Sequence, residues 1–336
     1  MPKLAFVVFE KESEKVRKGL IQKTGFFKKR IGTVVFQLLN KSKFKNGIHF
    51  LKMESGEEFL LIKMPFPLSR LPAFNRRYFE RYISQICSTN DCSHCFVPDL
   101  ARKLSGFEKY TLNANNRSIV FKALLLPILD EIYLKSDFRL DHLDTAFLNG
   151  ENIGELQTMV KQLEPYMKYI NVASPDHEDV EEGLSDICAE SGISIYVSSD
   201  LKGIFKNADL LINLGKVAAL SKVRIKPRSL VIDFSNGLAP KLHGEFTIIT
   251  GVEYTFPQNQ YDAMGDEVQR CFSRIELTEI LMAFKAGLLN GGSYNDTTVA
   301  LILNIFKKNG CKITGFNGRK GVLRVENVLK TINMKL

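Results

Sequence analysis

The segment LDTAFLNGENIG, from Leu143 to Gly154, decides the fold of this chain. Its first half is a short apolar run typical of a buried strand, and its second half is a turn that contains glycine. An amphipathic helical segment, ELQTMVKQLEPYM, follows directly. A strand, a glycine-containing turn and a helix in this order begin the Rossmann dinucleotide-binding unit, where the amides of the helix N-terminus face the pyrophosphate. The segment therefore predicts a Rossmann-type domain.

The sequence around this segment keeps alternating between short apolar runs and helical segments. The later apolar runs are YINVAS, ISIYVSS, DLLINL, SLVIDFS and FTIITG. Strands that alternate with helices form parallel sheets covered on both faces. We therefore predict an α/β protein, with an N-terminal α/β domain over residues 1–135, a Rossmann-like parallel-sheet domain over 136–260, and C-terminal helices over 261–336 that pack across the two.

Helical periodicity outside the Rossmann segment predicts further helices. One is expected from Arg117 to Lys135, and a long amphipathic one from Asp266 to Leu289. Another is expected from Asp296 to Lys308, and the segment RVENVLKTI predicts a last one near the end of the chain. In the N-terminal domain, the runs LAFVVFE, IGTVVFQLL, GIHFLKM and EFLLIKM predict strands, because they are apolar and bounded by turn residues.

The predicted phosphate loop departs from the G-x-G-x-x-G pattern. Only the last glycine, Gly154, is kept in that frame, and Glu151 replaces the glycine that lets backbone approach the pyrophosphate. Asn at the first position still tolerates a tight turn. True cofactor binding and a Rossmann scaffold without a dinucleotide both remain open. The candidate cofactor residues of the loop are Asn149, Gly150, Asn152, Ile153 and Gly154.

The end of the second Rossmann strand normally reads the ribose of the cofactor. An acid there accepts from the 2′-hydroxyl of NAD, whereas an Arg receives the 2′-phosphate of NADP. This chain offers Ser174 and Asp176 and no Arg, so NAD is favoured over NADP. The alternative for Asp176 is that it caps the helix that follows.

Three motifs in their order resemble the cofactor domain of the shikimate dehydrogenase and glutamyl-tRNA reductase superfamily. They are NGENIG, NADLLINL with Asn213, and SLVIDFSNG. Within that group, the strand ending at Gly251 and the helix TEILMAFKAG resemble the long-chain acyl-carrier-protein reductases. The resemblance implies an NAD(P)-dependent oxidoreductase, cofactor contacts at Asn213 and Gly251, and a cysteine that takes an acyl group as a thioester. Glu276 stands at that cysteine's place here, and Cys271 lies five residues earlier.

Two groups of cysteines are candidates for chemistry. We expect Cys271 to open a helix, where the helix dipole would favour the thiolate and make it a catalytic nucleophile; the alternative is a small buried side chain. Cys87, Cys92 and Cys95 have a C-x4-C-x2-C spacing, which would suit zinc or an iron–sulfur cluster if a fourth ligand joined them. The alternative is a tight polar turn at Asn90 with free thiols.

Composition limits the remaining function classes. No run approaches the ~18 apolar residues of a membrane span, and no signal peptide is recognised, so we expect a cytoplasmic protein. Residues 1–50 carry a net charge of +9 and residues 305–336 a net charge of +7, around a middle of −7. These basic ends suggest either an acidic partner or solvated lysine-rich faces. No motif favours a nucleic-acid partner.

Three hypotheses for function follow from the sequence. The first is an NAD(P)-dependent oxidoreductase that acts on an acyl or carbonyl substrate in the cleft between the domains. The second is a non-catalytic scaffold or regulatory protein with a degenerate phosphate loop, for which a homodimer is considered. The third is a metal-binding module at Cys87, Cys92 and Cys95.

Overall fold

The chain divides into two compact units, and each of them is built from two separate segments. The computed structural model describes residues 3–11, 47–52, 58–68, 71, 76–105, 112, 114–133, 139–149, 152–215, 224–235, 245–318 and 321–333. The first unit combines residues 1–113 with 256–281, and the second combines residues 114–255 with 282–336. The observed division differs from the boundaries predicted after residues 135 and 260, because the chain returns to the first unit after residue 255.

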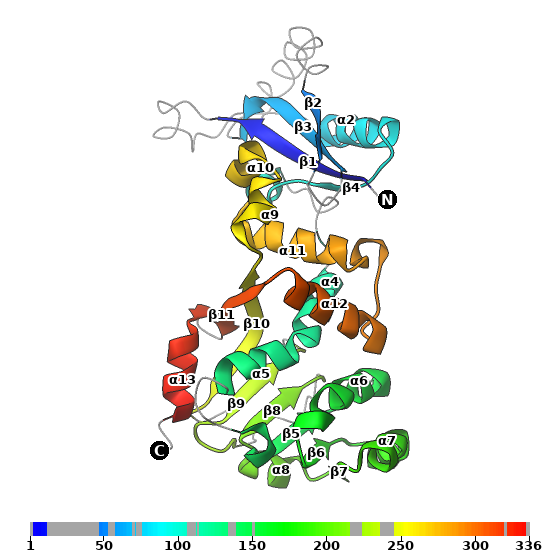
Figure 1. The fold of residues 1–336 in the computed structure, drawn as a ribbon, viewed down its shortest axis with the longest axis vertical. Coiled ribbons are helices and arrows are strands. Elements are labelled where there is room, and N and C mark those ends of the chain that lie inside the picture. The colour runs from blue at the N-terminus through cyan, green and yellow to red at the C-terminus, as the bar shows by residue number, and fades with distance from the viewer. Residues whose placement is uncertain are drawn as a thin grey trace. The chain divides into compact units, whose positions relative to one another are not determined.

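The first unit contains a four-stranded sheet with the order β2-β3-β1-β4 (Figure 1). The central strand β1 is parallel to both β3 and β4, whereas β2 pairs antiparallel with β3. The predicted strand IGTVVFQLL lies outside the described residues. The strands are β1 (Lys3–Glu10), β2 (Ile48–Lys52), β3 (Glu58–Pro67) and β4 (Cys92–Phe96).

Apolar side chains cover both faces of β1. On one face, Val7 packs in a cluster with Phe79 and Ile83 from the helix α2 (Arg76–Thr89). On the other face, the ring of Phe6 lies 5.5 Å, centroid to centroid, from Phe272 after α10 (Asp266–Cys271). Because both faces of the strand are buried, every residue from Leu4 to Phe9 is apolar, and the run ends at the exposed Glu10. The remaining helices of this unit are α3 (Asp99–Ser105), α9 (Gln258–Asp262) and the first part of α11 (Arg274–Lys285).

The second unit contains an eight-stranded sheet with the order β12-β11-β10-β9-β8-β5-β6-β7. Six of its strands, from β7 across to β10, are parallel. The strands are β5 (Thr145–Leu148), β6 (Tyr169–Ala173), β7 (Ser194–Ser198), β8 (Leu210–Asn213), β9 (Leu230–Asp233), β10 (Thr247–Thr255), β11 (Lys312–Gly318) and β12 (Gly321–Leu323).

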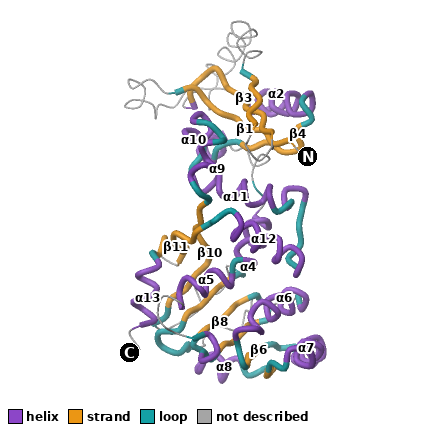
Figure 2. The backbone as a smooth tube through the Cα atoms, viewed as in Figure 1, coloured by secondary structure: helices purple, strands orange, loops and turns teal. Residues whose placement is uncertain are grey.

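The order of the parallel strands confirms the predicted fold class. Counted from β5 as the first strand, the order is 3-2-1-4-5-6, which is that of the doubly wound Rossmann fold. Figure 2 shows the helices α6 (Ile153–Leu163), α7 (His177–Ser191) and α8 (Leu201–Asn207) between successive strands. Gly192 is the C-cap of α7, and its φ of 73° places it in the left-handed region that glycine adopts without strain. The antiparallel pair β11 and β12 extends this sheet and was not predicted.

Two of the long helices predicted from periodicity are each divided in the structure. The helix expected from Arg117 to Lys135 is α4 (Ala114–Ala123) followed by α5 (Leu125–Tyr133). Pro127 explains the break, because its ring clashes with the carbonyl four residues earlier, at Ala123. The helix expected from Asp266 to Leu289 is α10, then α11, then a 3-10 turn at Leu288–Asn290.

The helices near the C-terminus agree with the prediction. α12 (Asp296–Lys308) has the predicted bounds, and Asn295 caps it by accepting a hydrogen bond of 2.9 Å from the Thr298 amide. α13 (Val325–Asn333) occupies the segment RVENVLKTI. Within the described ranges, none of the helices has both the length and the apolar character that crossing a membrane requires.

Candidate functional site

The candidate site lies at the carboxyl ends of β5 and β8, where the strand order of the second unit reverses. β5 is followed by a helix that leads to β6 on one side, and β8 is its neighbour on the other side. Open α/β sheets bind their ligands at this switch point, outside the carboxyl ends of the strands. The structure brings four of the predicted residues to this edge: Asn149, Asn152, Ser174 and Asn213.

Asn149 follows β5 and is 7% exposed. Its backbone amide continues the ladder by donating to the Ala173 carbonyl at 3.0 Å, and its Nδ2 donates to the Ser174 Oγ at 3.5 Å. Its Oδ1 is buried and has no hydrogen-bond partner among the described residues. A buried acceptor without a donor costs free energy, a cost that a donor from a ligand would remove. Gly150 and Glu151 lie outside the described residues.

The first turn of α6 is fixed by a side-chain cap. Asn152 is the N-cap residue, and its Oδ1 accepts a hydrogen bond of 3.3 Å from the Glu155 amide. A Cβ added to Gly154 would lie 3.3 Å from the same Asn152 oxygen, so the glycine keeps space for the cap. The helix N-terminus carries a partial positive charge, which favours an anionic group beside Ile153 and Gly154.

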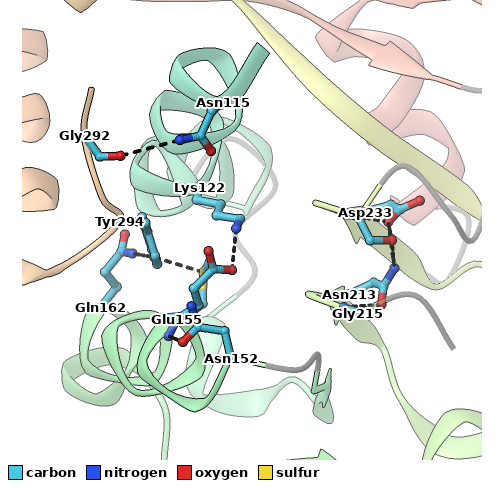
Figure 3. Close-up of polar contacts among 12 residues, drawn as sticks. Asn115, Lys122, Asn152, Glu155, Gln162, Asn213, Gly215, Asp233, Gly292 and Tyr294 are labelled. Atoms are coloured by element: carbon cyan, nitrogen blue, oxygen red, sulfur yellow. Dashed lines mark hydrogen bonds and ion pairs between the residues drawn. The ribbon is translucent and has the colours of Figure 1, made fainter. Parts of the chain in front are cut away.

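A partly buried ion pair, which sequence reasoning missed, lies beside this helix start. Lys122 of α4 pairs with Glu155 in the first turn of α6, with side chains 10% and 25% exposed (Figure 3). The Lys122 Nζ also lies 5.6 Å from the centre of the Tyr294 ring. The only indication in the sequence is that Lys122 is a single cation within the apolar run SIVFKALLL. The position of its partner depends on tertiary packing.

Asn213, at the end of β8, belongs to a second buried polar network (Figure 3). Its Nδ2 donates to the Asp233 Oδ1 at 2.7 Å and to the Ser235 Oγ at 2.6 Å, and its Oδ1 accepts from the Gly215 amide at 3.1 Å. Asn213 and Asp233 are both 0% exposed. The network joins the carboxyl ends of two neighbouring strands, β8 and β9, and thereby makes this edge rigid. Asp233 and Ser235 were not among the predicted site residues.

Two of the predicted cofactor contacts, Ser174 and Asp176, follow the end of β6. Ser174 is 1% exposed and holds Asn149, as described above. Asp176 is exposed and stands at the N-cap position of α7, yet its side chain makes no capping hydrogen bond. The alternative reading of Asp176 as a helix cap therefore has no hydrogen bond to support it.

Gly251 does not lie with the other predicted cofactor residues at the carboxyl ends of β5, β6 and β8. It lies within β10, two residues past Ile249, which is the last residue of β10 that pairs with β9. There β10 pairs with β11, and a Cβ added to Gly251 would come within 3.0 Å of the Asn317 side chain. The glycine is explained by this close approach of two strands.

The prediction that Cys271 opens a helix is wrong. Cys271 is the last residue of α10 instead of the first residue of a helix, so the N-terminal dipole does not act on its thiol. Its Sγ accepts a hydrogen bond of 3.3 Å from the Phe9 amide and packs against the core of the first unit. This is the alternative reading of Cys271 as a partly buried structural side chain.

Glu276 takes part in the start of the next helix, α11. Its Oε2 accepts from the Ser273 amide at 2.7 Å, while the Ser273 Oγ accepts from the Glu276 amide at 3.3 Å. Two side chains that satisfy each other's backbone amides in this way form a capping box. Glu276 Oε1 also accepts from the Asp99 amide at 2.6 Å. The residue at the place of the acyl-accepting cysteine is therefore used for helix capping.

The cysteines of the C-x4-C-x2-C motif lie on two different elements. Cys87 is on α2, whereas Cys92 and Cys95 are on β4, with a turn at Asn90 between them. The Cys87 and Cys95 thiols hydrogen-bond to each other. This bond lowers the pKa of Cys87 and, with burial, raises the pKa of Cys95 well above its ordinary value. In the part of the chain that the structure describes, no three His, Cys, Asp or Glu side chains are grouped as metal ligands. The geometry gives the metal hypothesis no support.

No protein-family model matches the sequence, and no curated protein matches it. Among solved structures, the chain is similar to a Δ1-pyrroline-2-carboxylate reductase of Thermococcus litoralis in complex with NADH and L-proline, with 12% identity over 36% of each chain and a TM-score of 0.28. It is also similar to an L-tryptophan dehydrogenase of Nostoc punctiforme, with 11% identity over 99% of this chain and 88% of that chain, and a TM-score of 0.28.

An ornithine transcarbamoylase of Giardia lamblia is similar to the same degree, with 12% identity over 84% of this chain and 86% of that chain, and a TM-score of 0.29. The match to the Thermococcus reductase spans only about a third of that protein's length. A reductase, a dehydrogenase and a transcarbamoylase are thus similar to this chain at equally low sequence identity and TM-score. The assignment of the second unit to the Rossmann fold consequently rests on its strand order.

Proposed function

We propose that the second unit binds a nicotinamide dinucleotide at the carboxyl ends of β5 and β8, and that the protein is an oxidoreductase for an acyl or carbonyl substrate. The observation that carries the proposal is the buried Asn149 Oδ1, which has no partner among the described residues and lies at the switch point of a 3-2-1-4-5-6 sheet. When bound, the nicotinamide would exchange a hydride with the substrate. The proposal includes the more specific resemblance to the long-chain acyl-carrier-protein reductases, for which the substrate would be an acyl group.

The residues at this edge fit the parts of a dinucleotide. The first-turn amides of α6, with Lys122 beside them, suit the two negative charges of the pyrophosphate. The exposed carboxylate of Asp176 suits a ribose hydroxyl. The acidic first turn of α7, with Glu178 and Asp179, would repel a 2′-phosphate. These features together support NAD over NADP.

We expect NAD or NADH to raise the temperature of thermal unfolding. A ligand at 100 times its dissociation constant stabilises a protein by about 2.7 kcal/mol, and NADP and NADPH should shift the transition less. Asp176→Ala should weaken NAD binding by roughly 10- to 100-fold, because it removes a charged acceptor. Asp179→Ala is the matched control, since Asp179 is exposed in the same helix turn. Calorimetric titration of both variants measures the difference.

Two results would contradict this proposal. One is the absence of any thermal shift at millimolar NAD, NADH, NADP or NADPH. The other is an equal loss of NAD affinity in the Asp176 and Asp179 variants, since only Asp176 is assigned to the ribose.

A second candidate function is a non-catalytic scaffold or regulatory protein. Two observations favour it: Cys271 is engaged with the backbone of Phe9, and Glu276 is engaged in a helix cap. In this case the basic side chains of residues 1–50 and 305–336 would bind an acidic partner, or a second copy of the chain. This candidate predicts that no nicotinamide cofactor changes the unfolding temperature.

A further inference from the structure

Three cysteines gather between the end of α2 and the edge strand β4 of the first unit. Cys87 lies in the last turn of α2, whereas Cys92 and Cys95 lie on β4. Only residues 90–91 connect the helix to the strand, so the chain reverses sharply between them. Cys87 belongs to the core cluster beneath α2, and Cys92 and Cys95 pack against the same cluster.

A register shift in β4 turns Cys92 and Cys95 to the same face of the sheet. Residues three positions apart on a regular strand point to opposite faces. Here two consecutive residues of β1 align with Cys92 and His94, so Ser93 is an additional residue in β4. Ala5 of β1, which belongs to the core cluster beneath α2, aligns with Cys95. The shift therefore places both thiols of β4 on the face that α2 covers.

Cys87 and Cys95 contact each other, and their two thiols are not equivalent. They are joined by a hydrogen bond and not by a disulfide. This hydrogen bond lowers the pKa of Cys87, although burial acts in the opposite direction. The same bond, burial, and the charges of Cys87 and Cys92 raise the pKa of Cys95. Cys87 is therefore the sulfur that ionises first, and Cys95 holds its proton against it.

The burial of the pair selects a small oxidant. Cys87 is 9% exposed, and Cys95 is partly buried. Exchange with a bulky disulfide requires that its sulfur reach the attacking thiolate, which the low exposure of Cys87 hinders. A hydroperoxide is smaller, and it oxidises thiolates to sulfenic acids that a neighbouring thiol converts into a disulfide. The arrangement of an ionising thiol beside a second thiol meets both requirements of that reaction.

We propose that Cys87 and Cys95 are a redox-sensitive pair, which a hydroperoxide oxidises to a reversible disulfide that links α2 to β4. The proposal does not rest on NAD binding, because the cysteines belong to the first unit and the proposed dinucleotide site to the second.

The oxidation takes two steps. The Cys87 thiolate attacks one oxygen of the hydroperoxide, the O–O bond breaks, and Cys87 becomes a sulfenic acid. The hydroxide or alkoxide that leaves takes the proton of Cys95. The Cys95 thiolate then attacks the Cys87 sulfur, the S–O bond breaks, and hydroxide leaves as the S–S bond forms. The two sulfurs lose two electrons in total, and the hydroperoxide gains them.

The test is mass spectrometry of the full chain after treatment with equimolar hydrogen peroxide, with the remaining thiols blocked by N-ethylmaleimide before digestion. Trypsin, used with a protease that cleaves before aspartate, separates Cys87 in peptide 82–90 from Cys92 and Cys95 in peptide 91–98. We expect the two peptides to be joined within one chain by a bond that dithiothreitol breaks. A disulfide between Cys92 and Cys95 would instead leave peptide 82–90 separate.

Serine variants identify the sulfur that joins Cys87. In Cys92→Ser, Cys95 is the one thiol left in its peptide, so the joined peptides should persist at the level of the unchanged chain. Cys188→Ser is the matched control, since Cys188 is a partly buried cysteine on α7 of the second unit. In Cys92→Ser/Cys95→Ser the join should be lost, and dimedone should trap the Cys87 sulfenic acid.

Three results would overturn the proposal. The first is that peptides 82–90 and 91–98 remain separate after peroxide treatment of the unchanged chain. The second is that the join is lost in Cys92→Ser but kept in the Cys188→Ser control, which would assign the bond to Cys92. The third is a join between two chains, which a non-reducing gel shows as a doubled mass.

Discussion

Asn213→Leu should lower the free energy of unfolding by about 1–3 kcal/mol, because it removes one of the donors to the buried carboxylate of Asp233, which keeps its hydrogen bonds from Ser235. Both side chains are 0% exposed, and their Nδ2 and Oδ1 atoms are 2.7 Å apart. Leucine is similar to asparagine in size, so the loss of the hydrogen bonds is the main change. For a domain of this size the unfolding temperature should fall by roughly 2–12 °C, measured by calorimetry or circular dichroism.

Asn304→Leu is the matched control for this prediction. Asn304 is exposed on α12, and a surface change of this kind is usually within about 0.5 kcal/mol. The double variant Asn213→Leu/Asp233→Leu should recover part of the lost stability, because replacing both partners removes the buried charge that has lost one of its donors. Equal unfolding temperatures for Asn213→Leu and Asn304→Leu would show that the network does not stabilise the carboxyl edge.

Lys122→Met should weaken NAD binding by roughly 10- to 100-fold, the second large effect that we expect. The substitution removes the cation beside the start of α6 and leaves the Glu155 carboxylate unpaired where the pyrophosphate is proposed to bind. Lys161→Met is the control, because Lys161 lies further along α6 in an exposed pair with Asp296 at 3.4 Å. Calorimetric titration with NAD compares the two variants.

The double variant Lys122→Met/Glu155→Gln separates two roles of the lysine. If Lys122 only neutralises Glu155, removing both charges restores NAD affinity. If Lys122 itself contacts the pyrophosphate, NAD affinity stays low although the stability lost with the unpaired carboxylate returns. An unchanged NAD affinity in Lys122→Met would contradict both roles.

The regular part of the fold could be predicted from sequence because local patterns determine it. Short apolar strands alternate with capped helices from Leu143 onward, and residues such as Gly192 mark helix ends by backbone conformation alone. The division of the first long helix was also encoded, since Pro127 cannot continue a helix from Ala123. The break before α11 coincides with the capping box of Ser273 and Glu276. It was missed because the amphipathic periodicity continues across these residues and predicted a single helix.

The parts that could not be predicted depend on contacts between distant segments. β11 contains Gly315 and Gly318, which weaken a strand pattern, and it forms because β10 offers a free edge. Lys122 lies 33 residues before Glu155, and no local pattern indicates that they meet. Asn213 was named from a resemblance, but its partner Asp233 is recognised only once two strands are aligned.

The interleaving of the two units affects how the polypeptide is completed on the ribosome. The first unit needs residues 256–281, which supply α10 against β1, and these emerge long after residue 113. At 5–20 residues per second, the N-terminal sheet waits roughly ten seconds or more for this segment. The second unit likewise lacks the partner of β10 until residues 312–318 are made. Neither unit can therefore complete its folding before its second segment is synthesised. Until then its apolar strands are exposed to aggregation, and we expect chaperones to bind them.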